Sequence, residues 1–201
     1  MYFFFFTMMY LASSLLNAFL FPVPPFKENS KLNDIFENQL KRIFQNNKRH
    51  DEGIDFVRFK NLLLNYKLLH VYNDNEIERL FTNEVEIDKL MNEQQFLNQA
   101  INVVKRIETL IENLYNTSLI HDKMTITELK IALFRANYSI SDARAIQLIN
   151  IERANAQDIS AIAFRNIFAK LYVHSIHSIR ENQEITSLKE SFPLYRSLDP
   201  R

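Results

Sequence analysis

One short pattern occurs four times in this chain and limits what it can fold into. Each copy opens with an aliphatic residue or methionine, continues through a few mostly polar residues and runs into an amphipathic helical pattern. A self-similar period of 20–50 residues is the sequence sign of a repeated supersecondary unit. The sequence therefore predicts a helix–loop–helix unit repeated four times. The opening residues, spaced by 37, 33 and 35 positions, are Ile54, Met91, Met124 and Ile159.

The segments between these openings are predicted to be helical. Apolar residues recur at intervals of three and four, which places them on one helix face. One glycine and five prolines are too few for the many tight turns of a β-sandwich. From Phe96 to Tyr115 no glycine or proline interrupts the pattern, which favours one long central helix. The fold class is thus predicted to be all-α, with two pairs of helix–loop–helix units joined by that helix.

The run Ile54-Asp55-Phe56-Val57-Arg58-Phe59 carries a resemblance to a known family. It is similar to the EF-hand pattern of Ile, polar, Phe, any residue, Glu and Phe. Over residues 32–180 the chain resembles four-repeat EF-hand proteins of the calmodulin and myosin light-chain type. The resemblance implies an N-terminal pair over residues 32–104 and a C-terminal pair over residues 105–180. It also implies that the opening residue is loop position 8, and that Ile54 bridges to Met91 and Met124 to Ile159.

The loops implied by this resemblance do not carry a calcium ligand set. A calcium loop takes oxygen ligands from positions 1, 3, 5, 7 and 9 and a bidentate glutamate at position 12. The four loops are residues 47–58, 84–95, 117–128 and 152–163, called loops one to four below. Position 12 is Arg58, Gln95, Glu128 and Ala163 in turn. Loop three keeps its glutamate but has Leu119 and His121 at positions 3 and 5.

Loop two is the one loop left open for weak metal binding. Glu84, Glu86 and Asp88 stand at its positions 1, 3 and 5. No cofactor is expected, calcium being the only ion that the resemblance brings, and tight calcium binding is not predicted.

The N-terminus, which precedes the repeated units, is strongly apolar. Residues 2–22 hold no charged side chain, which predicts a signal peptide or a membrane anchor over residues 1–22. Small residues permit cleavage, for instance after Ala18, and a buried first helix is the remaining alternative. Residues 23–31 are expected to form a proline-containing spacer and residues 181–201 a flexible tail. The expected location is secreted or in the secretory lumen, or else anchored in a membrane.

Composition narrows the function classes. Lysine plus arginine equals aspartate plus glutamate, 24 of each, so no charge excess points to nucleic acid. Nucleophile motifs and phosphate-binding glycine loops are not found, so an enzyme is not expected. Contact with a membrane is expected only through an uncleaved N-terminus. Asn116 and Asn137 begin glycosylation sequons, which matter only in a secreted chain.

The resemblance implies a binding module that holds an amphipathic helix of a protein partner in a groove. The alternatives are a weak calcium-binding protein and a structural or oligomerising helical protein. A closed lobe with no groove is equally open. The groove would be lined by Phe59, Leu63, Phe134, Phe164 and Phe168.

Overall fold

The computed structural model describes residues 20–21, 23–27, 31–49, 52–64, 72–172 and 174. The prediction of an all-α fold is confirmed: these residues form helices connected by loops, and their extended pairing is limited to isolated bridges. Residues 1–19 and 22 of the predicted leader, and the whole predicted tail over residues 181–201, lie outside the described residues. The helices are α2 (Asp34–Asn47), α3 (Phe56–Leu64), α5 (Asp74–Thr82), α6 (Glu93–Asn116), α7 (Ile126–Arg135) and α8 (Asp142–Ile151), followed by a last helix over residues 161–172.

Polar residues fix where α2, α5 and α8 begin, and each of these helices leads into one of the loops. The side chains of Asn33, Asn73 and Ser141 each accept a backbone N–H from the first turn of α2, α5 and α8. Glu76 completes a capping box by accepting the N–H of Asn73 at 2.9 Å. Each such cap satisfies a donor that the helix leaves unpaired and stabilises it by about 1 kcal/mol.

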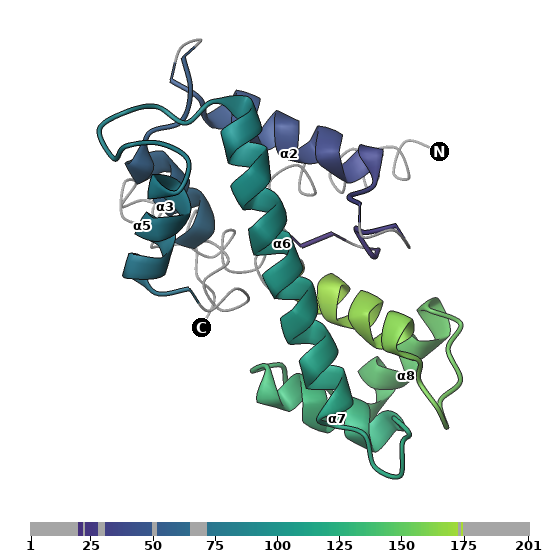
Figure 1. Ribbon diagram of the computed structural model, residues 1–201. Coiled ribbons are helices and arrows are strands. Elements are labelled where there is room, and N and C mark those ends of the chain that lie inside the picture. The colour runs from purple at the N-terminus through teal and green to yellow at the C-terminus, as the bar shows by residue number, and fades with distance from the viewer. Residues whose placement is uncertain are drawn as a thin grey trace, which may run out of the picture.

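Helix α6 is the long central helix that the unbroken apolar pattern predicted, with 24 residues. Its first half ends the second helix–loop–helix unit and its second half begins the third. It buries apolar residues along its length, including Val103, Val104 and Ile107, all fully buried. In Figure 1, α6 runs through the middle of the molecule, with α3 and α5 on one side near one end and α7 and α8 around the other.

Aromatic rings form the core of the first pair of units. Phe59 of α3, Phe81 of α5 and Phe96 of α6 are fully buried. The Phe59 ring lies 5.7 Å from that of Phe81 and 6.4 Å from that of Phe96, between centroids. These buried ring contacts join three helices, because aromatic pairs stabilise a core through both burial and ring geometry. Within the described residues, no helix is both long and apolar enough to cross a membrane.

Candidate functional site: the four helix-connecting loops

The opening residues of the units come together in two pairs. Ile54 and Met91 exchange two backbone hydrogen bonds, of 3.0 and 2.9 Å, in an antiparallel bridge. In the second pair the Ile159 N–H donates to the Met124 carbonyl at 2.7 Å. The Ile159 carbonyl accepts a different donor, the Tyr115 hydroxyl of α6, at 3.0 Å. All four opening side chains are fully buried, so each pair of loops is held by backbone pairing above an apolar core.

The one glycine of the chain stands at the first of these bridges. Gly53 has φ 149°, a conformation that L side chains rarely adopt, and a Cβ there would lie 2.5 Å from the Met91 carbonyl oxygen. A side chain at this position would push apart the backbones that pair at Ile54 and Met91. Glycine is therefore required here by close approach as well as by φ.

Position 9 of every loop is the N-cap of the outgoing helix. The Asp55 carboxylate accepts the Arg58 N–H at 2.8 Å, and the Asn92 amide oxygen accepts the Gln95 N–H at 3.0 Å. Thr125 and Ser160 cap α7 and the last helix in the same way, with bonds of 3.3 Å. Short polar side chains one residue after the bridge thus start all four outgoing helices.

In the N-terminal pair, the side chain at position 12 reaches back to the start of its loop. Arg58 Nη1 donates to the carbonyls of Asn47 and Lys48 at 3.0 and 3.1 Å. Gln95 Nε2 donates to the Glu84 carbonyl at 2.8 Å, and Gln99 Nε2 donates to the Glu84 carboxylate at 2.7 Å. Each loop is therefore closed by N–H donors that tie position 1 to the outgoing helix.

In the C-terminal pair, the closing donors stand further along the outgoing helix, either three or seven residues after loop position 12. Arg135 Nη1 donates to the Thr117 carbonyl at 3.1 Å and to the Ser118 hydroxyl at 3.2 Å. In loop four, the Glu152 carboxylate accepts Asn166 Nδ2 at 3.0 Å and the Lys170 ammonium. Seven residues are two helical turns, so a long side chain there can reach the same end of the loop. Position 1 is again the residue that is held.

Glu128, the one glutamate at position 12, is used within its own helix. Its Oε2 accepts the Thr125 N–H at 3.0 Å and the Thr125 hydroxyl, as a capping box for α7. The side chain is buried, and the hydrogen bond from the Thr125 hydroxyl holds the pKa of Glu128 below its ordinary value. This carboxylate is already satisfied by N–H and O–H donors and is turned toward the cap.

The three carboxylates of loop two are engaged separately. Glu84 is held by Gln99, as described above, while Glu86 pairs with Lys89 at 2.8 Å and lies exposed. Asp88 is also exposed. Over the described ranges, the structure contains no group of three or more His, Cys, Asp or Glu side chains placed to hold a metal ion.

The five residues expected to line a partner groove do not share one surface. Phe59, Leu63, Phe164 and Phe168 are buried in the core, because the helices close over them. Phe134 is 70% exposed on α7. The groove inferred from the sequence is therefore filled by the residues that were to line it, and only Phe134 remains at the surface.

Other apolar groups accompany Phe134. Ile131 precedes it by one turn of α7, and Ile146 lies on α8; both are exposed, and they line a shared depression beside the Lys130–Asp142 ion pair. A second depression of about 350 Å³ lies between α6, the end of α7 and the last helix, and Phe168 and Tyr172 form part of its wall. One residue of each surface, Phe134 and Phe168, was predicted from the sequence, but both were placed in a single groove.

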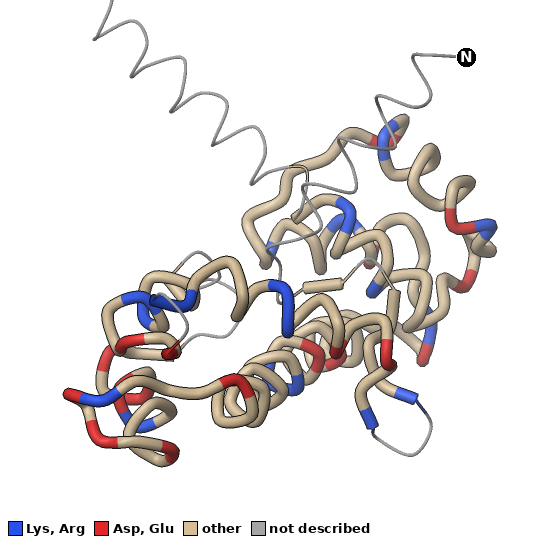
Figure 2. The backbone as a smooth tube through the Cα atoms, turned by 90° about the horizontal axis from the view of Figure 1, so that it is seen from above, with Lys and Arg blue, Asp and Glu red and all other residues tan. Residues whose placement is uncertain are grey.

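Charge does not select one face of the molecule. Figure 2 shows lysine and arginine interspersed with aspartate and glutamate along the backbone.

Comparison with known proteins finds no matching family model, no matching curated protein and no matching solved structure.

Proposed function

We propose that this chain is a non-catalytic, EF-hand-like protein that binds a protein partner without calcium. One observation carries the proposal: a side-chain N–H donor of the outgoing helix holds the first residue of every loop. In a calcium loop the ion draws both ends of the loop together. Here guanidinium, amide and ammonium groups of the chain perform that function permanently.

A permanent closure also removes the calcium switch. Sensor proteins open when the ion reorganises the loops, because the position-12 carboxylate moves toward it. Arg58 and Gln95 occupy that position with donors, and Glu128 is held by Thr125. The proposed partner therefore binds without a calcium-driven change in the loops.

The partner we propose is an amphipathic protein helix that docks on the outer face of α7 and α8. Ile131, Phe134 and Ile146 are exposed there, and an aromatic residue among aliphatic ones is a common anchor of such contacts. The Lys130–Asp142 pair borders the patch and offers both signs of charge. None of the exposed apolar residues of this patch is a methionine, so the surface adapts poorly to different sequences and favours one dedicated partner.

The experiment compares two charge substitutions at exposed apolar positions in opposite halves. Phe134→Asp places a charge in the proposed patch, whereas Val57→Asp places one on α3, where Val57 is 64% exposed. Helical peptides from a displayed library are selected on the unaltered protein in the presence of a calcium chelator. We expect Phe134→Asp to weaken their binding at least about tenfold, about 1.4 kcal/mol, and Val57→Asp to leave it unchanged.

Two results would count against this function. One is a selection that yields binding peptides only when the chelator is replaced by calcium. The other is equal loss of binding in the two variants, which would place the contact elsewhere.

The location we propose is the secretory pathway, with a membrane anchor as the alternative. The support is the uncharged run over residues 2–22, which contains the length of apolar sequence typical of a signal peptide. Intact mass of the protein from its native source decides between them. A chain that begins after Ala18 supports secretion, and a chain that retains Met1 supports the anchor.

A further inference from the structure

Two described residues at the edge of the predicted leader are packed into the folded molecule. Leu20 and Phe21 are 0% and 1% exposed. The Phe21 ring lies 4.4 Å from that of Phe36 on α2, between centroids. A leader boundary at residue 22 would therefore remove two side chains of the core, whereas cleavage after Ala18 would leave both in place.

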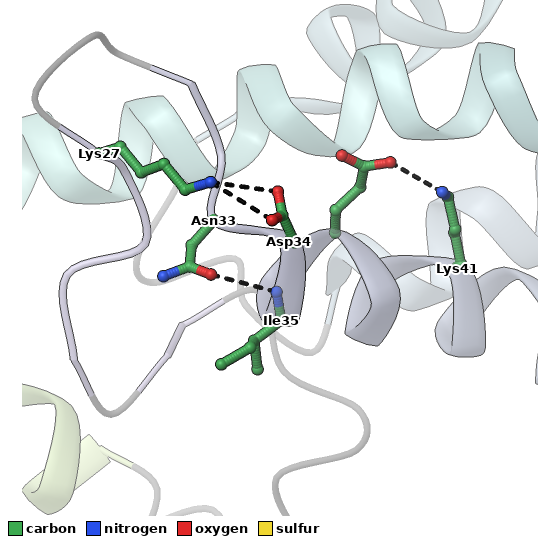
Figure 3. A network of polar contacts seen from close by, with 6 residues as sticks. Lys27, Asn33, Asp34, Ile35 and Lys41 are labelled. Atoms are coloured by element: carbon green, nitrogen blue, oxygen red, sulfur yellow. Dashed lines mark hydrogen bonds and ion pairs between the residues drawn. The ribbon is translucent and has the colours of Figure 1, made fainter.

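The other end of this segment is fixed to the start of α2. The N–H of Asn33 donates to the Pro25 carbonyl at 2.9 Å, and Phe26 pairs with Leu32 in an isolated bridge. Lys27 Nζ reaches the Asp34 carboxylate at 3.2 Å, as Figure 3 shows. Residues 23–31 were expected to be a spacer, but the described residues 25–27 are paired with the start of α2.

A buried arginine of the last helix holds the backbone of the segment. Arg165 is 6% exposed and forms a two-point pair with the Glu108 carboxylate of α6, at 3.0 and 2.6 Å. Its remaining terminal nitrogen, Nη1, donates to the Phe21 carbonyl at 2.6 Å. The carboxylate orients the planar guanidinium, so that one N–H points at the chain that lies across it.

A cleft between α6 and the last helix lies beside the Arg165–Glu108 pair. A depression of about 230 Å³ is lined by Pro24 together with Ile111, Tyr115, Ile162 and Arg165. In Figure 1 the purple trace that precedes α2 lies between α2 and the last helix, drawn in yellow-green. The segment therefore contacts the first pair of units through Phe36 and the second pair through Arg165.

We infer that the cleft formed by α6, the last helix and α2 is a peptide-binding site whose ligand is the chain's own segment 20–26, Leu-Phe-Pro-Val-Pro-Pro-Phe. The ligand class is an apolar, proline-containing peptide whose phenylalanine carbonyl accepts a hydrogen bond. Arg165 recognises the carbonyl, and the apolar core beside Phe36 takes the ring. This site is separate from the α7–α8 face, so it stands or falls independently of the proposed partner.

The test uses the full chain and a labelled synthetic peptide of residues 20–26. The double variant Leu20→Ala, Phe21→Ala vacates the site, while the unaltered chain keeps it occupied. We expect the double variant to bind the peptide at least about tenfold more tightly than the unaltered chain. A peptide with alanine at Leu20 and Phe21 should not bind, and one with alanine at Val23, which is 48% exposed, should bind normally.

The inference would be overturned if the peptide bound equally well to the unaltered chain and to the double variant. It would also be overturned if the alanine peptide bound, or if the double variant kept its helix content but bound no peptide. If the double variant fails to fold, Arg165→Lys replaces it, because lysine keeps the charge facing Glu108 but loses the planar fork. We expect proteolysis within residues 19–27 to be at least about tenfold faster in Arg165→Lys than in Arg144→Lys, a matched change on α8 outside the cleft. Equal rates would overturn the inference.

Discussion

The two pairs of loops are closed at the same place by side chains from different positions. In the N-terminal pair the donor stands at loop position 12, as Arg58 and Gln95. In the C-terminal pair the donors stand one or two helical turns later, as Asn166, Arg135 and Lys170. The reason lies at position 12 itself: Glu128 is an acceptor committed to the α7 cap, and Ala163 has no reach. Closing a loop requires a side-chain donor that reaches the first loop residue, and several positions of the outgoing helix can supply it.

The backbone bridges differ between the pairs as well. Ile54 and Met91 share two hydrogen bonds and depend on Gly53 for their close approach. Met124 and Ile159 share one, while Tyr115 satisfies the Ile159 carbonyl from α6. The first bridge therefore relies on backbone fit and the second on a side chain. Substitutions at these two points should affect the two halves unequally.

The largest effect is expected for Gly53→Ala. The added Cβ would lie 2.5 Å from the Met91 carbonyl oxygen, at a φ of 149°. Strain and the lost bridge together should lower the free energy of unfolding by about 3 kcal/mol or more. Urea denaturation followed by circular dichroism measures it. Lys123→Ala, at the equivalent place in loop three, is the control and should cost less than about 0.5 kcal/mol; similar costs for both would contradict the account.

A smaller difference is expected between Arg58→Ala and Lys170→Ala. Arg58 donates to two carbonyls of loop one, so its loss should cost about 1.5 kcal/mol. In loop four, Asn166 still holds Glu152 when Lys170 is removed, so that loss should cost about 0.5 kcal/mol. Denaturation midpoints of the two variants rank them. The reverse order would show that closure does not depend on how many donors each loop has.

Tyr115→Phe tests the side-chain support of the second bridge. Removing the hydroxyl leaves the Ile159 carbonyl without that donor, at a cost of about 1 kcal/mol. The Tyr115 pKa is raised, first by burial and then by the nearby Asp158 carboxylate, so the hydroxyl stays protonated as a donor at neutral pH. Amide hydrogen exchange should quicken at Ile159 and leave Ile54 unaffected. An equal change at both residues would mean that the two bridges are not independent.

The smallest effect concerns acid. The Thr125 hydroxyl lowers the pKa of Glu128 in the folded protein, so its contribution is present above the unfolded pKa and is lost as pH falls through the folded pKa. The stability of the unaltered chain should therefore decline with acid more steeply than that of Glu128→Gln. Thermal melts from neutral pH down to below the ordinary carboxyl range compare the two. Parallel declines would remove Glu128 from the account.

The sequence predicted the features that depend on periodicity. The spacing of the four opening residues indicated the repeated unit, and the unbroken apolar pattern indicated α6. The sequence holds a further signal one position after each opening residue. A good N-cap residue stands there in all four units: Asp55, Asn92, Thr125 and Ser160. Reading them would have located the start of every outgoing helix.

The closing donors and the docked segment were beyond the reach of the pattern. Arg135 and Lys170 lie on exposed helix faces, where a cation looks the same whether it faces water or a carbonyl. Leu20 and Phe21 end an apolar run, and composition does not distinguish a leader from core residues. The buried groove phenylalanines were misplaced for a related reason: an apolar helix face packs equally well against a partner or against its own neighbours.

A calorimetric calcium titration tests the central claim most directly, because it asks whether the loops need an ion that their own donors replace. We expect no binding heat at micromolar calcium and no change in helix content, in the unaltered chain and in Arg58→Ala alike. A dissociation constant below about 10⁻⁵ M, the range of calcium sensors, would contradict it.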